Sequence, residues 1–226
     1  PFMRGYAPTS VPESGVYQTA ALARDANALH DALGGDEHAV IIGHDWGAPT
    51  VCGAALDAPQ RWRKVVSMSV PPGPALGAAF LSNLAQIQSS WYMFFFQHPL
   101  SNYVVAANDM AFIDMLWAQW SPGYAAVADL AHVKDALRNP DNLQAALGYY
   151  RATLGDGKRD PDLASLQERI GREFPSQPML YLHGENCGCV GIEIAKAAQA
   201  SAPAHVRFEY IANAGHFVQV EQPNLV

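Results

Sequence analysis

Hydrophobic residues in the first third of the chain follow two different spacings. Steps of four, three and four residues, typical of the buried face of a helix, separate Leu22, Ala26, Leu29 and Leu33. Gly34-Gly35 is expected to end this helix, because glycine readily takes the left-handed backbone angles found at helix ends. The continuous apolar run 40–42 then predicts a strand that is buried on both faces.

The alternation of helix and strand continues on both sides of a long interval. The further elements that the pattern predicts are helices at 47–57 and 191–200 and strands at 64–70, 179–183 and 206–211. Helices that alternate with buried strands are typical of an α/β fold, in which helices cover a mostly parallel sheet.

The interval between residues 73 and 161 is helical in pattern and rich in aromatic residues. They are Trp91, Tyr92, Phe94, Phe95, Phe96, Trp117, Trp120, Tyr149 and Tyr150. A helical insertion in a parallel sheet is expected to cover the carboxyl ends of the strands, where ligands bind in such folds. The sequence therefore predicts an α/β core at 1–72 and 162–226 and a helical lid at 73–161.

Composition restricts the classes of partner. Half of the 226 residues are hydrophobic and 15% are charged, which is typical of a well-buried globular enzyme. The net charge is −7 and the basic residues do not cluster, so nucleic acid is a poor candidate partner. The apolar stretches are too short or too polar to predict a membrane span.

The three cysteines do not predict a disulfide framework or a metal site. Cys187 and Cys189 form a C-x-C pair, but no second pair of ligands stands at zinc-like spacing. We expect them, with Cys52, to be free thiols in a reducing cytoplasm.

A possible nucleophile lies between the strand at 40–42 and the helix at 47–57. Gly43-His44-Asp45-Trp46-Gly47 has the pattern small-x-nucleophile-x-small of the sharp turn called the nucleophile elbow. Asp45 occupies the central position, and a carboxylate there attacks an alkyl carbon and leaves an ester on the protein. Since no serine occupies such a turn, a serine-type esterase is nearly excluded.

A possible general base follows the last predicted strand. His216 lies in the loop Asn213-Ala214-Gly215-His216-Phe217, and a histidine late in the chain fits the order nucleophile, acid, histidine of this kind of fold. It would remove a proton from the water that attacks the Asp45 ester.

Four motifs together resemble the soluble epoxide hydrolases of the α/β-hydrolase fold. They are the elbow 43–48, the segments 91–99 and 148–151 of the predicted lid, and Gly215-His216-Phe217 with Glu221-Gln222-Pro223. The resemblance begins at Arg4-Gly5-Tyr6 and continues to the end of the chain, and the two lid segments are its most specific part. It implies a hydrolase that converts epoxides into vicinal diols with no metal or organic cofactor.

The resemblance also implies roles for residues of the lid and the elbow. Tyr92 and Tyr150 match the two lid tyrosines of the family, whose phenols stabilise the oxygen that leaves the epoxide carbon. The backbone N–H of Trp46 is expected to form half of the oxyanion hole. An apolar, aromatic lid implies a hydrophobic small-molecule substrate.

The chain departs from the family's pattern at two places. The family's first four strands and its second oxyanion loop would precede Arg4, so we expect them to be missing here. Cys187 stands where the family has the aspartate that supports the histidine. Glu185 is near in sequence but out of register, and the segment 67–71 offers no carboxylate, so the acid is unassigned.

Two other functions remain open from the sequence. A haloalkane or haloacid dehalogenase would use the same Asp45 and His216, with indole N–H groups of Trp46 and Trp91 as halide ligands. A binding protein that has lost turnover is the second alternative, and Cys187 is the residue that supports it. The sequence does not indicate the oligomeric state.

Overall fold

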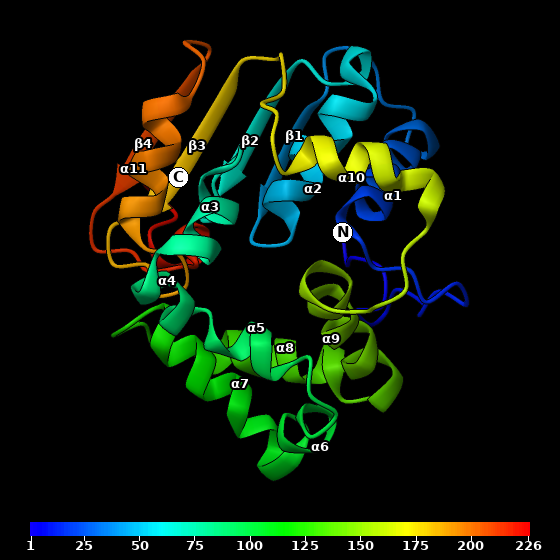
Figure 1. Cartoon of the computed structure of the whole chain (residues 1–226), viewed down its shortest axis with the longest axis vertical. Coiled ribbons are helices and arrows are strands. Elements are labelled where there is room, and N and C mark those ends of the chain that lie inside the picture. The colour runs from blue at the N-terminus through cyan, green and yellow to red at the C-terminus, as the bar shows by residue number, and fades with distance from the viewer.

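Four parallel strands form the centre of the computed structural model, which describes residues 1–226. The strands are β1 (Val40–His44), β2 (Lys64–Met68), β3 (Met179–Gly184) and β4 (Val206–Ile211), and they pair in this order. Every pair is parallel, so the carboxyl ends of all four strands lie at one edge of the sheet (Figure 1). The predicted strands are confirmed, with β2 two residues shorter than expected.

Helices cover one face of this sheet. The largest buried cluster joins that face to α1 (Thr19–Ala32), α2 (Gly47–Asp57), α10 (Ala164–Ile170) and α11 (Ile192–Ser201). Ile41, Val65, Tyr181 and Phe208 supply the strand side of the cluster. Helix α1 packs mainly on α2 rather than on the sheet, so α2 lies between α1 and the sheet.

The opposite face of the sheet is only partly covered. The short helix α12 (Val218–Glu221) packs over Met68, Leu182 and Ile211 near the carboxyl edge. At the β1 end Val40 is 42% exposed and Ile42 is 62% exposed. The prediction that the run 40–42 is buried on both faces is therefore wrong, because no element of residues 1–226 packs against that side of β1.

The predicted buried face of α1 is confirmed at Leu22 and in part at Ala26, but it is wrong toward the end of the helix. Leu33 lies just past the helix and is 83% exposed, and Leu29 is 41% exposed, while Ala20, Ala23 and Asn27 are buried. Small alanine side chains let α1 approach α2 closely. Asn27 is satisfied inside this contact, because it accepts a hydrogen bond from the indole N–H of Trp62 at 2.9 Å and donates one to Ala54 O.

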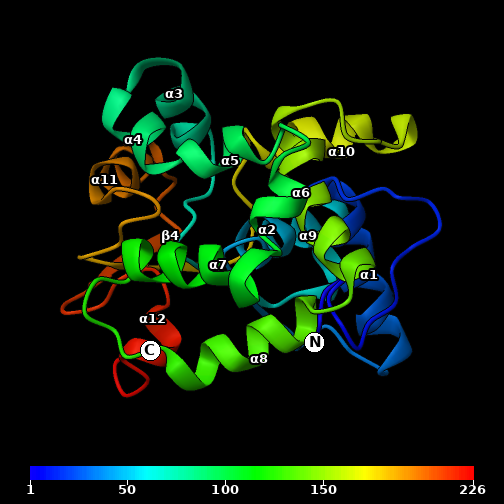
Figure 2. The ribbon, with the colours of Figure 1, turned by 90° about the horizontal axis from the view of Figure 1, so that it is seen from below.

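A long helical segment joins β2 to β3. Its first helices are α3 (Ala75–Ser82), α4 (Leu84–Ser89), α5 (Trp91–Phe95) and α6 (Ser101–Val104), followed by α7 (Ala107–Trp120), α8 (Val127–Leu137) and α9 (Pro140–Leu154). Short 3-10 turns lie at Pro59–Arg61 and Pro161–Leu163. Figures 1 and 2 show helices α5 to α9 as a separate layer beyond the carboxyl ends of the strands. None of the helices has the length and apolar character that crossing a membrane requires.

Replacing Asn27 by alanine should destabilise the protein by about 2 kcal/mol, because the buried indole N–H of Trp62 then loses its acceptor. The free energy of unfolding in urea, followed by tryptophan fluorescence, measures this loss. Leu29→Ala on the exposed side of α1 is the control and should cost about 0.5 kcal/mol or less. Equal losses in the two variants would contradict the orientation of α1.

Candidate active site

Asp45 occupies a strained turn between β1 and α2. Its φ is 52°, a left-handed conformation that is uncommon for residues other than glycine. A methyl group on Gly43 would lie 2.1 Å from Gly47 O, so only glycine fits there. A methyl group on Gly47 would meet nothing within 4 Å, and crowding therefore does not explain that glycine. The turn holds the Asp45 carboxylate at the carboxyl edge of the sheet.

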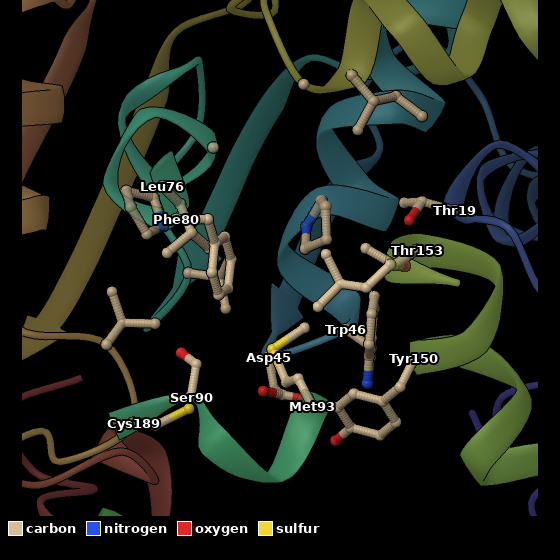
Figure 3. Close-up of a pocket in the computed structure, with 18 of the residues that line it drawn as sticks. Thr19, Asp45, Trp46, Leu76, Phe80, Ser90, Met93, Tyr150, Thr153 and Cys189 are labelled. Atoms are coloured by element: carbon tan, nitrogen blue, oxygen red, sulfur yellow. The ribbon is translucent and has the colours of Figure 1, made fainter. Parts of the chain in front are cut away.

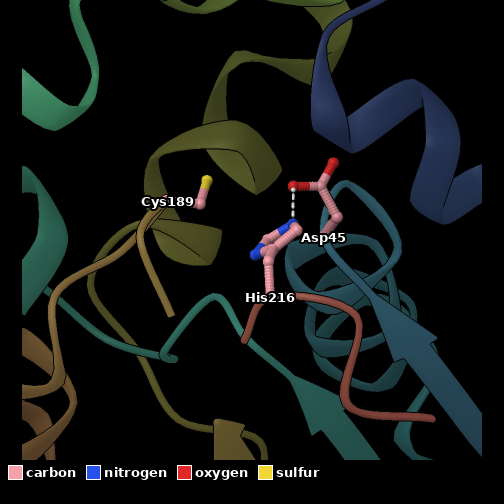
Figure 4. A group of neighbouring side chains, drawn as sticks. All are labelled: Asp45, Cys189 and His216. Atoms are coloured by element: carbon pink, nitrogen blue, oxygen red, sulfur yellow. Dashed lines mark hydrogen bonds and ion pairs between the residues drawn. The ribbon is translucent and has the colours of Figure 1, made fainter. Parts of the chain in front are cut away.

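His216 lies in the loop after β4 and meets Asp45 at this edge. Its Nε2 is 3.0 Å from Asp45 Oδ2, although 171 positions separate the two residues in the chain. The histidine is fully buried, and Figure 4 shows its ring directed at the carboxylate. The two residues that the sequence predicted as nucleophile and base are therefore in direct contact.

Each partner of this contact shifts the pKa of the other. Burial raises the pKa of Asp45, but the hydrogen bond and charge of His216 outweigh it, and the pKa lies below its usual value. A hydrogen bond from the backbone N–H of Trp46 acts in the same direction. Burial lowers the pKa of His216, whereas the neighbouring Cys189 and Asp45 raise it well above its usual value. The contact therefore favours a carboxylate beside an imidazolium.

A carboxylate that sequence analysis did not assign holds the His216 loop. Glu221 accepts hydrogen bonds from Gly215 N at 2.7 Å, from Phe217 N at 2.9 Å and from the Ser121 hydroxyl at 2.6 Å. Ser121 Oγ in turn accepts from His216 N at 2.9 Å. The loop is thus fixed by α12 and by the end of α7, which lies about a hundred residues earlier in the chain.

The carbonyl oxygen of His216 is anchored from the sheet. It accepts a hydrogen bond from the Ser69 hydroxyl at 2.6 Å and one from His44 Nε2 at 2.8 Å. Burial and the nearby His216 lower the pKa of His44 to about 4, so its ring is neutral near pH 7. His44 therefore positions the loop and does not place a second positive charge beside Asp45.

The second ring nitrogen of His216 faces a thiol. Cys187 Sγ lies 3.6 Å from His216 Nδ1, while Glu185 is exposed to solvent. Ser69, after β2, contributes only its hydroxyl. A sulfur is a weak hydrogen-bond partner, and a protonated thiol carries no charge. The structure thus provides no carboxylate at Nδ1, as the sequence indicated.

A cavity of about 300 Å³ opens in front of Asp45. Figure 3 shows the carboxylate between Cys189 and Ser90 on one side and Trp46 and Tyr150 on the other. Just over half of its lining residues are hydrophobic, and the wall is completed by Thr19, Pro49, Val70, Pro71, Gly73, Leu76, Gly77, Phe80, Tyr92, Met93, Thr153, Leu154, Gln167, Ile170, Gly171 and Val190. The cavity suits an apolar small molecule.

Both predicted lid tyrosines belong to this wall. The rings of Tyr92, on α5, and Tyr150, on α9, are 5.8 Å apart at their centroids. Burial, with the nearby Asp45 charge as a smaller cause, raises the pKa of each well above 10, so both phenols keep their protons. The adjacent Tyr149 points elsewhere, since its hydroxyl donates to Arg4 O at 2.7 Å.

Cys189 is the wall residue that sequence analysis did not place at the site. Its Sγ is 3.4 Å from the Tyr92 hydroxyl. The sulfur, a ring nitrogen of His216 and a carboxylate oxygen of Asp45 all lie within 4.8 Å of one another. The only sequence signal was the C-x-C pair. All three cysteines are free, as the sequence predicted.

Comparison with known proteins agrees with the fold. The family model described as "alpha/beta hydrolase fold" matches residues 3–223. The chain therefore belongs to the alpha/beta hydrolase fold family. It is 25% identical to the human protein Epoxide hydrolase 4 over 99% of this chain and 61% of that protein. It is 26% identical to YfhM of Bacillus subtilis, an AB hydrolase superfamily protein, over its whole length and 76% of that protein.

Solved structures give the same fold. One from Klebsiella pneumoniae, of a protein proposed to be an epoxide hydrolase, superposes with a TM-score of 0.81 at 29% identity. It is matched by 99% of this chain, which covers 76% of that structure. The chain spans 54–61% of the length of the first curated relatives that it matches.

Replacing Asp45 by asparagine should lower the pKa of His216, because the variant replaces the negatively charged acceptor at Nε2 by a neutral amide. Ring ¹⁵N chemical shifts followed through a pH titration measure the change, and the imidazolium should persist to higher pH in the unmodified protein. Asp25→Asn, which removes a carboxylate paired with Arg4, is the control and should leave His216 unchanged. An unchanged pKa in Asp45→Asn would assign the shift to the neighbouring Cys189 and Cys187.

Proposed function

We propose that this protein is an epoxide hydrolase that converts hydrophobic epoxides into vicinal diols through an ester on Asp45. The observation that carries the proposal is the placement of an ionised carboxylate, hydrogen-bonded to a buried histidine, in an apolar cavity with two protonated phenols. The curated relatives named epoxide hydrolases support the same reaction.

In the first step, a carboxylate oxygen of Asp45 attacks one epoxide carbon. The carbon–oxygen bond breaks, and the electron pair goes to the epoxide oxygen. Tyr92 and Tyr150 stabilise this alkoxide by hydrogen bonds, and one phenol gives it a proton. Their raised pKa values favour this role, since a phenol that stays protonated is a donor and not a competing base.

In the second step, His216 removes a proton from a water molecule, which attacks the carbonyl carbon of the ester. Esterification neutralises Asp45 and so removes one of the charges that raise the pKa of His216. The imidazolium thereby gives up its proton, which restores the phenol that protonated the alkoxide, and His216 becomes a free base. The backbone N–H of Trp46 stabilises the oxyanion of the tetrahedral intermediate. When the intermediate collapses, the ester oxygen leaves and takes the proton of the new Asp45 carboxyl group, so that the diol departs and the carboxylate and imidazolium are restored.

The helical segment 73–161 serves in this proposal as the lid. It brings Tyr92 and Tyr150 to the carboxyl edge of the core and contributes apolar residues such as Leu76, Phe80 and Met93 to the cavity. A hydrophobic substrate would displace water from this wall, which strengthens the hydrogen bonds that the phenols make to the alkoxide.

A dehalogenase is less well supported by the site. Trp91 does not line the cavity but packs on Phe112 with ring centroids 5.7 Å apart. The indole of Trp46 lies in the wall with its nitrogen directed at Tyr150 (Figure 3). No pair of free indole N–H groups therefore faces Asp45. Cys187 keeps the third possibility open, a site that forms the ester and clears it slowly.

Excess styrene oxide should add the mass of one substrate molecule to the peptide that contains Asp45, and diol should follow. We expect the ester to accumulate during the first turnover, because His216 lacks a carboxylate at Nδ1. Peptide mass spectrometry and diol chromatography measure the two events, and Asp45→Asn should abolish both. The absence of adduct and diol in the unmodified protein would contradict the proposal for this substrate.

A second pair of variants tests why the ester accumulates. Cys187→Asp should hydrolyse the ester at least about tenfold faster, because a carboxylate then supports the imidazolium that forms as water attacks. Cys187→Ser also removes the thiol but adds no charge, so it should not accelerate the step. Equal rates in the two variants would show that charge at this position does not limit hydrolysis.

Replacing Tyr92 and Tyr150 together by phenylalanine should slow ester formation from the epoxide by a factor of about 10²–10³, because the alkoxide then loses its hydrogen-bond donors. Rapid-quench measurement of the adduct gives this rate. Tyr149→Phe is the matched control, since its hydroxyl binds Arg4 O outside the cavity. Chloride release from a chloroalkane that proceeds equally well in the double variant would instead favour the dehalogenase.

A further inference from the structure

Three different donor atoms face one another where the cavity meets the sheet. They are the thiol of Cys189, the Nε2 of His216 and a carboxylate oxygen of Asp45 (Figure 4). We propose that these atoms form an inhibitory site for a divalent transition-metal ion of the Zn²⁺ type. The geometry of the side chains carries this proposal, which does not depend on the protein being an epoxide hydrolase.

The separations of the donor atoms are close to those of a tetrahedral ion. All three lie within 4.8 Å of one another, and the Asp45 and His216 atoms are 3.0 Å apart. Bond lengths of about 2.0–2.3 Å to Zn²⁺ place tetrahedral ligands roughly 3.3–3.8 Å apart. The Asp45 and His216 atoms have to separate by a few tenths of an ångström, and Cys189 Sγ has to approach by about 1 Å, which a rotation about χ1 can provide.

The donor set selects the kind of ion. One sulfur, one imidazole nitrogen and one carboxylate oxygen suit Zn²⁺ and its chemical relatives, whereas Mg²⁺ and Ca²⁺ prefer oxygen alone. A thiolate and a carboxylate together balance the double positive charge of the ion. Binding releases two protons to the solvent, one from the Cys189 thiol and one from His216 Nε2.

Surrounding groups hold each ligand in orientation. The Tyr92 hydroxyl is 3.4 Å from Cys189 Sγ and can donate to the thiolate, and Cys187 Sγ is 3.6 Å from the second nitrogen of His216. The loop between the two cysteines packs tightly on the end of α7, because a methyl group on Gly188 would lie 2.0 Å from Gln119 O and Gly188 N donates to Trp120 O at 3.0 Å. Such outer contacts are a regular feature of metal sites in proteins.

The cavity supplies both the entry path and the open fourth position. Asp45 and Cys189 belong to its wall, so an ion reaches them without any rearrangement of the sheet. Three protein ligands and one open position are typical of catalytic zinc sites. A bound ion would engage the carboxylate oxygen and the imidazole nitrogen at once, and would therefore block any chemistry that needs either of them.

Titration of the reduced protein with Co²⁺ tests the proposal without turnover. One equivalent should produce a near-ultraviolet sulfur-to-cobalt charge-transfer band together with intense tetrahedral d–d bands, and an excess of Zn²⁺ should remove them. Cys189→Ser should lose the charge-transfer band, whereas Cys187→Ser and Cys52→Ser should retain it. Asp45→Asn should weaken Co²⁺ binding at least about tenfold.

X-ray absorption of the cobalt-loaded, unmodified protein provides a second readout that needs no variant. We expect one sulfur in the first coordination shell, with nitrogen and oxygen as the other ligands. A shell with no sulfur or with two, or a band that is lost in Cys187→Ser and kept in Cys189→Ser, would overturn the site. Such an outcome would leave the proposed hydrolase function unaffected, since that function is tested by the adduct on Asp45.

Discussion

The contact between Asp45 and His216 is the constraint on which the rest of the site depends. It joins the turn after β1 to the loop after β4, and it is possible only because parallel strands bring all their carboxyl ends to one edge. A strained φ of 52° directs the carboxylate into the cavity, and Glu221 and Ser121 fix the loop that carries the histidine. The helices beyond this edge then determine what the pair can meet, since they supply the two phenols and part of the apolar wall. The α/β core therefore carries the charged pair of Asp45 and His216. The helical segment carries the two phenols and part of the cavity wall.

The residues predicted from the sequence are those with strong local signals. The glycine-flanked turn after an apolar strand indicated Asp45, the loop after the last strand indicated His216, and Tyr92 and Tyr150 stood in recognisable segments of the resemblance. The strand positions and the α2 boundaries also followed from local patterns. All of these signals lie within a few residues of the position concerned.

The parts that could not be predicted depend on contacts between distant segments. Glu221 reaches Ser121 across a hundred positions, and Cys189 enters the wall because its loop packs against the end of α7. The buried side of α1 was right at Leu22 but wrong at Leu29 and Leu33. Hydrophobicity alone favoured leucine, whereas close approach to α2 favours alanine and a hydrogen-bonded Asn27. The exposure of Ile42 has the same origin, since a run of apolar residues does not reveal whether anything covers its second face.

The thiol beside His216 Nδ1 has a consequence for the number of electrophile molecules that the protein can remove. A site that forms its ester quickly and clears it slowly consumes one protein molecule for each electrophile until hydrolysis catches up. In a brief pulse of electrophile, the number of molecules removed is then set by the abundance of the protein and not by its turnover number. Such a protein acts as a stoichiometric scavenger at short times and as a catalyst only at long ones. The crossover between the two regimes is set by the support that one side chain gives to an imidazolium.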